Sequence, residues 1–403
     1  MSTLTPRPIK DYCLGIYDGP HATPEESDEG PIFLGIKNIT DDGRIDLSDV
    51  RHVSENQFPK WTRRVTPTAG DVVFTYEATL HRYAVIPTDF RGCLGRRVAL
   101  VRPNTSLVDS RYLLYYFLSS AWRCVIEGNV MSGATVDRIP LERFPEFPVV
   151  LPGLEVQKRV VAVLSNYDDL IENNRRRMAL LEDSARQLYR EWFVRLRFPG
   201  HEHTPIVDGV PQGWKKVRVD ELGTVLTGKT PSTKDADNYG GDIQFVKTPD
   251  MHGNAFVLQT ETQLTEKGAK SQANKFLPPG ALLVSCIGTV GVVSLTSELC
   301  QFNQQINAVI PMEDFLRYYS YFALKDLKPR LDAIGGGVTM ANVSKGKFES
   351  MDVLRPTSAL LRNFDEFSSP VFNQIKVFGQ QNQKLRQARD LLLPRLMNGE
   401  LAV

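Results

Sequence analysis

Residues 154–193, LEVQKRVVAVLSNYDDLIENNRRRMALLEDSARQLYREWF, repeat an apolar side chain in alternating steps of four and three positions. This heptad spacing predicts one long helix with a single apolar seam. A helix of about 40 residues is ~60 Å long, which exceeds the width of a small domain, so the helix needs a partner along its length. The predicted seam consists of Val160, Leu164, Tyr167, Ile171, Asn174, Met178, Leu181, Ala185, Leu188 and Trp192.

A second stretch near the C-terminus matches this helix at an offset of 204 residues. Its seam is less pure, because Ser368 and Arg389 occupy two seam positions, and Pro394 should end or kink the helix near its last turn. Two matching seams in one chain are most simply packed on each other. Asn174 and Asn382 lie on these seams, where they either fix the register or are satisfied by water at an imperfect layer. The alternative, in which each helix covers a core of its own, remains open. The other predicted seam residues are Phe364, Val371, Ile375, Phe378, Leu385 and Leu392.

The helices belong to a larger internal repeat. Gly133-Ala134-Thr135 returns as Gly337-Val338-Thr339 at an offset of 204, and residues 70–73 match residues 280–283 at 210. A period near 200 residues is too long for a solenoid and describes two copies of one module. Each copy starts with a β-rich stretch punctuated by Gly and Pro, whose predicted strands include 31–37, 71–76, 98–102, 243–246 and 281–286.

One short aromatic helix lies within each β-rich stretch, at residues 111–122 and 315–324. The predicted fold class is therefore α+β, with two β-rich domains separated by two long helices. The predicted boundaries are 1–152 for the first β-rich domain, 153–200 for the first helix, 201–356 for the second β-rich domain and 357–403 for the second helix.

Composition excludes few classes of protein. The 403 residues include 48 Lys plus Arg and 47 Asp plus Glu, and this balance of +1 argues mildly against DNA binding. Five scattered cysteines without a C-x-x-C pair are typical of reduced thiols in a cytoplasmic protein, and the N-terminus lacks an apolar signal core. Residues 276–297, the longest uncharged stretch, are expected to form two buried strands around Gly288 and Gly291 rather than a membrane span.

Residues 223–230, GTVLTGKT, fit the phosphate-loop pattern G-x-x-x-x-G-K-T. That mechanism needs a helix that opens at the lysine, whereas the residues after Thr230 are polar and turn-rich. We therefore expect a polar loop between strands. The histidines of His201-Glu202-His203 are expected to be solvated linker residues rather than metal ligands. No catalytic constellation is legible, which predicts a protein without enzymatic activity of its own.

Charge is unevenly distributed along the first copy. Residues 18–49 carry nine acidic and two basic side chains, a balance of −7, whereas residues 51–102 carry nine basic and four acidic ones, a balance of +5. Arginine suits phosphate and guanine edges, so Arg63-Arg64 and Arg96-Arg97 are candidate contacts. The second copy matches Arg96-Arg97 with Gln304-Gln305, and amides suit adenine. For each single residue, a solvated surface charge is an equally open alternative.

The chain resembles the specificity (S) subunit of type I restriction–modification enzymes, and the likeness covers nearly its whole length. It is specific in the helices and looser in the β-rich parts. It also explains the false phosphate loop as the usual start of a target-recognition domain. The motifs that carry it are DGPHATP at 18–24, Leu151-Pro152 leading to Gln157, IENN at 171–174, LEDSARQLYREW at 181–192, TGKTPS at 227–232 and LLPRLMNGEL at 392–401.

This resemblance implies two target-recognition domains, each reading one half of an asymmetric bipartite DNA site. It implies that the long helices pack as an antiparallel coiled coil, which spaces the domains and docks two methyltransferase (M) subunits. Restriction (R) subunits would complete the complex. The S subunit itself would hold no catalytic residue and no cofactor, with S-adenosylmethionine, ATP and Mg²⁺ on its partners. Its expected location is the cytoplasm, without a membrane segment.

Residue type and repeat position give the candidate DNA contacts. Two other classes of protein remain as alternatives: a P-loop nucleotide-binding enzyme, resting on Gly228-Lys229-Thr230, and a coiled-coil scaffold that does not read DNA. The candidates in the first domain are His21, Lys37, Arg63, Arg64, Arg82, Arg96, Arg97 and Thr135. Those in the second are Lys229, Thr230, Lys247, Lys270, Lys275, Asn303, Gln304, Gln305 and Thr339.

Overall fold

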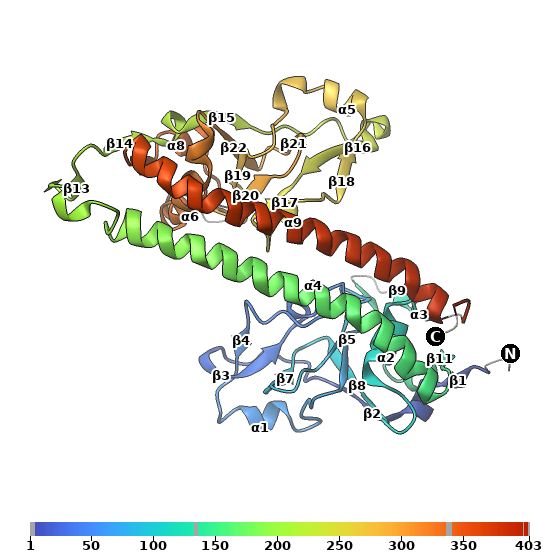
Figure 1. Cartoon of the computed structure of the whole chain (residues 1–403). Helices are drawn as coiled ribbons and strands as arrows, with labels where there is room; N and C mark the ends of the chain where they lie inside the picture. Colours follow the sequence, from blue (N-terminus) through green and yellow to red (C-terminus); the bar gives the residue numbers. More distant parts are fainter. Residues whose placement is uncertain (1–4, 133–135, 336–340, 398, 402–403) are drawn as a thin grey trace. The chain divides into compact units, whose positions relative to one another are not determined.

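The computed structural model describes residues 5–132, 136–335, 341–397 and 399–401. The chain divides into two units, each of mixed α/β structure (Figure 1). The first unit combines Met1–Asp169 with Leu385–Val403, and the second comprises Leu170–Lys384. The candidate contacts Thr135 and Thr339 lie outside the described residues.

The first unit is built on two sheets. One has four strands in the order β2 (Cys13–Asp18), β8 (Val98–Pro103), β5 (Val72–Thr75) and β6 (Tyr83–Val85). The other has three, in the order β4 (Arg51–His52), β3 (Ser27–Leu34) and β7 (Gly92–Leu94), with β3 and β7 parallel. The remaining elements are β1 (Arg7–Pro8), β9 (Met131–Ser132), β10 (Asp137–Arg138), β11 (Pro148–Val149), α1 (Phe58–Trp61), α2 (Ser110–Leu118) and α3 (Ser120–Glu127).

The second unit repeats this plan. Its larger sheet has the order β15 (Gly223–Thr227), β22 (Ile306–Pro311), β19 (Leu282–Ser285), β20 (Val293–Thr296) and β17 (Phe256–Val257). Its smaller sheet has the order β18 (Thr262–Leu264), β16 (Tyr239–Val246) and β21 (Cys300–Phe302), with β16 and β21 parallel. The remaining elements are β12 (Ile206–Val207), β13 (Val210–Pro211), β14 (Lys215–Arg218), β23 (Asp352–Arg355), α5 (Glu266–Lys270), α6 (Arg317–Asp326), α7 (Lys328–Gly335) and α8 (Lys345–Glu349).

The two sheet systems confirm the internal repeat. β2-β8-β5-β6 has the same order and the same antiparallel pairing as β15-β22-β19-β20. The predicted strands are found with small changes at their ends, except that Ile36 and Lys37 lie in a 3₁₀ turn, Ile36–Asn38, after β3. Residues 276–297 hold the buried strands β19 and β20, joined through Gly288 and Gly291, which both have positive φ. Across the described residues, no helix combines the length and apolar character needed to span a membrane.

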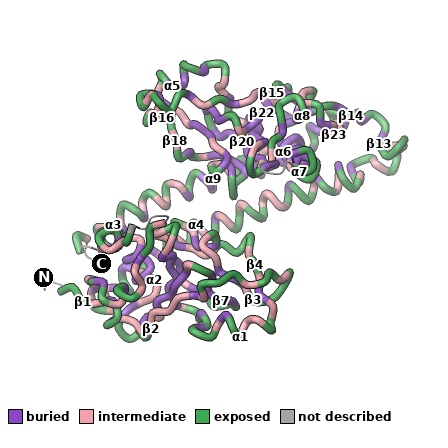
Figure 2. Tube along the Cα trace, turned by 180° about the vertical axis from the view of Figure 1, so that it is seen from behind, coloured by how far each residue is buried: buried purple, intermediate pink, exposed green. Residues whose placement is uncertain are grey.

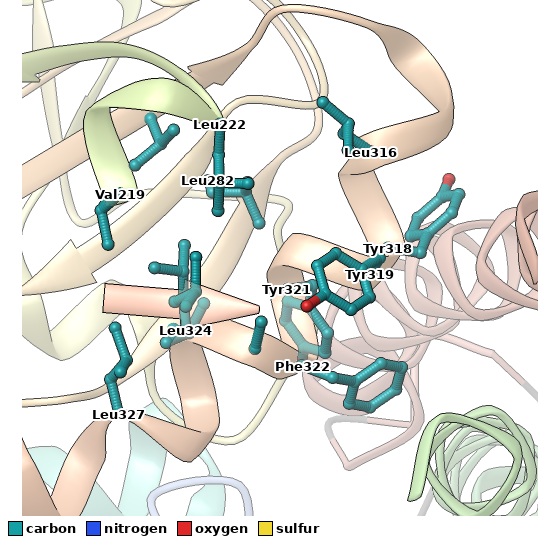
Figure 3. Packing of buried hydrophobic residues seen from close by; sticks show 14 of the residues in the cluster. Val219, Leu222, Leu282, Leu316, Tyr318, Tyr319, Tyr321, Phe322, Leu324 and Leu327 are labelled. Carbon is teal, nitrogen blue, oxygen red and sulfur yellow. The ribbon is translucent and has the colours of Figure 1, made fainter. Parts of the chain in front are cut away.

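The aromatic helices cover one face of the larger sheets. In the first unit, Asp109 caps the start of α2, because its carboxylate accepts hydrogen bonds from the backbone N–H groups of Arg111 and Tyr112. α3 contributes the fully buried Trp122. In the second unit, α6 carries Tyr318, Tyr319, Tyr321 and Phe322, which lie on one side of a continuous apolar cluster (Figure 3). The buried strands and aromatic helices form the purple interior of each unit in Figure 2.

The two long helices are α4 (Leu154–Tyr189), extended by a π-helical segment at Arg190–Val194, and α9 (Ser358–Met397). The first matches the helix predicted for residues 154–193. α9 continues through Pro394 to Met397, so the proline does not itself end the helix, and it also contains Pro370 in its interior. A proline removes one N–H donor from a helix, and we attribute its tolerance here to the burial of neighbours such as Phe372 and Leu393.

The predicted seam residues are all buried or half-buried. Near the end of α4, however, Tyr189 and Phe193 are buried more deeply than the predicted Leu188 and Trp192, and in α9 Leu393 is buried more deeply than Leu392. A straight helix has 3.6 residues per turn and drifts by ~20° per heptad from a strict 3.5 repeat, so its buried face moves by one residue. Heptad counting therefore locates the buried face but not its last residues.

Candidate nucleic-acid interface

In each unit, three of the loops between strands meet at one end of the larger sheet. In the first unit, the amide of Tyr76 donates to the carbonyl oxygen of Arg97 at 3.2 Å, and that of Gly19 donates to Val98 at 3.0 Å. In the second, the amide of Cys286 donates to the carbonyl of Gln305 at 2.8 Å. Arg97 and Gln305 therefore occupy the same backbone position of the repeat, as the sequence predicts.

The side chains of the first unit at this end form a charged cluster, which we define as Asp18, His21, Arg64, Tyr76, Glu77 and Arg97. Asp18 accepts from Arg64 at 2.5 Å and lies 3.0 Å from Nε2 of His21. The Tyr76 hydroxyl lies 3.5 Å from Nδ1 of the same histidine. Burial, with the carboxylates of Asp18 and Glu77, raises the pKa of Tyr76 to about 12, so the phenol stays protonated at neutral pH.

Arg97 holds the most constrained position in the charged cluster. Its Nε lies 2.8 Å from Oε1 of Glu77, and its backbone has a φ of +71°. Ala78, beside Glu77, has a φ of +70°, another left-handed conformation in a residue with a Cβ. Such conformations cost of order 1 kcal/mol or more and concentrate at functional sites. The neighbouring Arg96 is exposed, and no ion pair joins it to another described residue.

The equivalent end of the second unit is lined by uncharged polar groups, which we call the amide cluster: Thr227, Thr230, Asn303, Gln304, Gln305 and Asn307. The Thr230 hydroxyl donates to Oε1 of Gln304 at 2.5 Å, and Nδ2 of Asn303 donates to Oε1 of Gln305 at 3.0 Å. These contacts occupy one lone pair of each glutamine oxygen and leave both NH₂ groups as donors. At matching ends of their larger sheets, the first unit thus has charged side chains and the second unit has uncharged polar ones.

Several predicted contacts do not join these clusters. Lys37 pairs with Asp49 at 2.6 Å, Lys270 pairs with Glu266 at 2.8 Å, and Arg82 donates to the carbonyl of Ile39 at 3.0 Å. Lys275 is half-buried in a 3₁₀ turn, and Lys247 is half-buried after β16. Arg63 follows α1, and Lys229 follows β15; both are exposed.

The clusters also contain residues that the sequence reasoning missed. Asp18, Tyr76 and Glu77 complete the charged cluster, and Thr227 and Asn307 complete the amide cluster. Thr227 donates to Oδ1 of Asn307 at 2.7 Å across β15 and β22. A polar residue inside the apolar strand at 306–311 was the available signal for Asn307, whereas nothing local pairs Asp18 with Arg64, 46 positions away.

The phosphate-loop alternative fails on geometry. Residues 223–227 form β15, and the amides of Gly228 and Lys229 donate to the carbonyls of Ile306 and Phe302. Those N–H groups are therefore not available to cradle a phosphate. The residues that follow Thr230 lead to a 3₁₀ turn at Ala236–Asn238 instead of a helix that opens at the lysine.

The histidines and cysteines offer no metal site among the described residues. No group of three or more His, Cys, Asp and Glu side chains in that part of the chain could hold a metal ion. His201 and His203 lie in a 3₁₀ turn, where Nδ1 of His201 is 2.8 Å from the carbonyl oxygen of Phe198. All five cysteines are free thiols.

The chain thus contains two copies of one module, and the polar clusters at the matching ends are lined by different side chains. The chain belongs to the family described as "Type I restriction modification DNA specificity domain", whose model matches residues 35–183 and 211–358. It is thus a type I restriction–modification specificity subunit, a class of non-catalytic subunits that recognise DNA.

Similarity to known proteins supports the assignment to this family. The chain is 26% identical over 387 residues to the type I restriction enzyme HindI specificity subunit of Haemophilus influenzae, covering 79% of this chain and 84% of that one. It is 23% identical over 408 residues to the MjaIX specificity subunit of Methanocaldococcus jannaschii, covering 98% and 89%. A type I restriction–modification S subunit from M. genitalium, solved by crystallography, has a similar fold, with a TM-score of 0.51, 14% identity and coverage of 98% and 96%.

Proposed function

We propose that the two β-rich domains, residues 1–152 and 201–356, are target-recognition domains that each read one half of an asymmetric bipartite DNA site. One observation carries the proposal: the same backbone position holds Arg97 in the first domain and Gln305 in the second. Arginine favours guanine edges and phosphate, whereas an amide favours adenine. Two recognition domains with different side chains at matching positions are expected to bind two half-sites of different sequence.

We assign the charged and amide clusters as the base-reading ends of these domains, with Arg96 and Lys229 exposed beside them. The ion pairs Arg64–Asp18 and Arg97–Glu77 hold the arginines in place before DNA binds. A phosphate or guanine edge then competes with a carboxylate for the guanidinium, which disfavours loose non-specific binding. The other predicted contacts are proposed to bind phosphates: Lys37, Arg63, Arg82, Lys247, Lys270, Lys275, Thr135 and Thr339.

The long helices, residues 153–200 and 357–403, are proposed to pack as an antiparallel coiled coil that spaces the two domains. Contacts within each unit support this pairing. Asp168 meets Arg389 in the first unit, and in the second Asn174 meets Asn382 while Tyr189 meets Phe364. The residue numbers of these contacts increase along α4 while they decrease along α9, as expected for two antiparallel helices. The seam residues named from the heptads are the proposed contact surface.

The same helices are proposed to dock two M subunits, and R subunits join that core. Exposed apolar side chains on the helices, such as Leu180 on α4 and Val377 on α9, fit a protein partner better than solvent. S-adenosylmethionine, ATP and Mg²⁺ are assigned to the partner subunits. We propose a cytoplasmic location, which fits five reduced thiols.

The test is footprinting of duplex DNA by the chain mixed with its M subunit. DNA that contains the methylated site of the host genome should show two short protected patches, separated by an unprotected spacer. A single continuous patch, or none, would contradict the bipartite reading. A complex that assembles through the helices without protecting DNA would favour the scaffold. Scrambling one half-site should abolish both patches at limiting protein, because each domain supplies part of the affinity.

A further inference from the structure

A tyrosine hydroxyl joins each recognition domain to α4. The aromatic helices share the spacing Arg-Tyr-x-x-Tyr, at Arg111–Tyr115 in α2 and at Arg317–Tyr321 in α6. Tyr115 donates to Oδ2 of Asp168 at 2.5 Å, and Tyr321 donates to Oε1 of Glu182 at 2.8 Å. Both acceptors belong to α4 and are two heptads apart in its sequence. Each unit therefore joins its aromatic helix to α4 through one tyrosine hydroxyl, although the two acceptors do not occupy equivalent positions of the repeat.

A basic side chain completes each contact, which gives two tyrosine triads. The first triad is Tyr115, Asp168 and Arg389, with Nη1 of Arg389 2.7 Å from Oδ1 of Asp168. The second is Tyr321, Glu182 and Lys325, with Nζ of Lys325 2.6 Å from Oε1 of Glu182 and 2.7 Å from the Tyr321 hydroxyl. In each, a carboxylate of α4 receives one phenol and one cation.

The phenols of both triads and the guanidinium of Arg389 are buried, whereas the side chains of Asp168, Glu182 and Lys325 remain 34%, 27% and 38% exposed. Tyr115 and Tyr321 are 3% and 1% exposed, and Arg389 is 8% exposed. Burial, followed by the nearby carboxylate, raises the pKa of both phenols, so both remain donors at neutral pH. Hydrogen bonds to a charged group are among the stronger ones in proteins, and removing the hydroxyl leaves the carboxylate with one partner fewer.

Apolar packing alone would fix the orientation of the aromatic helices on the long helices less tightly. In the second unit, Tyr318 stacks on Phe372 of α9 and Phe322 packs on Tyr189 of α4. Figure 3 shows these rings of α6 grouped beside the long helices. Apolar contact is non-directional, so a ring layer tolerates small rotations. A short hydrogen bond restricts both distance and angle.

We propose that Tyr115 and Tyr321 are positioning residues that fix each recognition domain on α4 and so determine which spacer length between the two half-sites is accepted. This inference rests on the proposed bipartite function. A domain that can rotate on α4 moves its reading end relative to the helix, and one base pair of spacer changes both the distance and the rotation of a half-site. Removing a triad hydroxyl should therefore widen the range of accepted spacers.

The experiment uses the complete chain with its M subunits and measures methylation of synthetic duplexes. The site is first identified by mapping methylated bases in the host genome, and duplexes are then made with the native spacer and with one base pair added or removed. For Tyr115→Phe and Tyr321→Phe, methylation at the native spacer should stay within about threefold. The preference over the altered spacers should fall by about tenfold, as expected for the loss of ~1.4 kcal/mol.

Tyr112→Phe is the matched control, since Tyr112 is a buried tyrosine of the same α2 helix outside the triad, and it should keep the full spacer preference. Glu182→Gln tests the second triad from its acceptor and should also lower the preference. A purely structural role would lower the melting temperature and all rates together without changing the spacer ratio, and that result would overturn the inference. A wild-type complex that methylates no split site would overturn the proposed function itself.

Discussion

Asn174 and Asn382 face each other as a buried amide pair: Nδ2 of Asn174 donates to Oδ1 of Asn382 at 3.0 Å. Nδ2 of Asn382 in turn donates to the carbonyl oxygen of Ile171 at 3.3 Å. Each side-chain amide thus supplies one hydrogen-bond partner to the other, in a seam that is otherwise mostly apolar. A polar pair of this kind favours one register, because a shift would bury both amides without partners.

Replacing one partner should cost more than replacing both. Asn174→Leu leaves the Asn382 amide without its donor and should lower the free energy of unfolding by about 1–3 kcal/mol. Asn174→Leu with Asn382→Leu should recover most of that loss. Urea unfolding of both single variants and the double variant measures the coupling, with Asn173→Leu at an exposed neighbouring site as control. Additive losses would show that the pair is not coupled.

Arg97→Ala should abolish protection of cognate DNA without preventing assembly. The loss of one arginine that contacts a base should weaken binding by about 1–3 kcal/mol, or roughly five- to 150-fold. Arg91→Ala is a matched control, since Arg91 also pairs with a glutamate, Glu55, at the other end of β7. Footprinting measures protection, and co-purification with the M subunit measures assembly. Unchanged cognate binding would remove Arg97 from the interface.

The glycine of the false phosphate loop should be required for folding rather than for nucleotide binding. A Cβ at Gly228 would lie 2.1 Å from the carbonyl oxygen of Asn303, which is backbone and cannot move aside easily. Gly228→Ala should therefore destabilise the chain by about 1–3 kcal/mol. Gly346→Ala has open space and lies in α8, so it should be neutral or stabilising by up to about 1 kcal/mol. Thermal unfolding compares the two.

Cys124 should react with a thiol reagent faster than the other four cysteines. Burial raises the pKa of Cys13 and Cys286 to about 11 and that of Cys93 and Cys300 to about 12, so these thiols stay protonated and unreactive near neutrality. Cys124 is exposed. A thiol reagent at pH 8 should therefore modify one cysteine quickly and the others only on unfolding, and Cys124→Ser should remove the fast phase. Several fast phases would contradict this order.

The same raised pKa values predict a loss of stability in alkali. The folded thiols keep their protons above the ordinary thiol pKa of 9.0, whereas unfolded thiols release them. The unfolded state then binds fewer protons, so this contribution is complete below pH 9 and is lost as pH rises towards 12. Unfolding in urea at pH 8 and at pH 10 should show a lower midpoint at pH 10. Replacing the buried Cys93 and Cys300 with Ala should reduce the difference.

The parts of the fold that depend on local periodicity could be predicted. The 4-3 spacing of residues 154–193 gave a helix that the structure starts at the same residue, Leu154. The repeat also matches Arg97 with Gln305, and the structure gives both residues the same backbone position. In both cases the signal lies in the order of residues along the chain.

Long-range pairing limited the prediction of the site. Residue type alone predicts Arg64 and Arg97 as positive charges available to DNA. In the structure, each is paired with a carboxylate, of Asp18 or Glu77, that lies 46 or 20 positions away in the sequence. Arg389 looked like a defect of the seam, whereas its buried guanidinium pairs with Asp168. Such pairs depend on the tertiary fold, so residue type alone could not reveal them.

The anchoring of the backbone at Arg97 and Gln305 has a consequence for how specificity can change. In each unit, the sheet holds this position through its carbonyl oxygen, which bonds to the amide of Tyr76 or Cys286. The side chain takes no part in that bond, so the fold accepts groups as different as a guanidinium and an amide. The side chain at this position can therefore change while the backbone of the sheet stays the same. Under the proposed function, one substitution at this position in either unit would change which base is favoured and leave the fold intact.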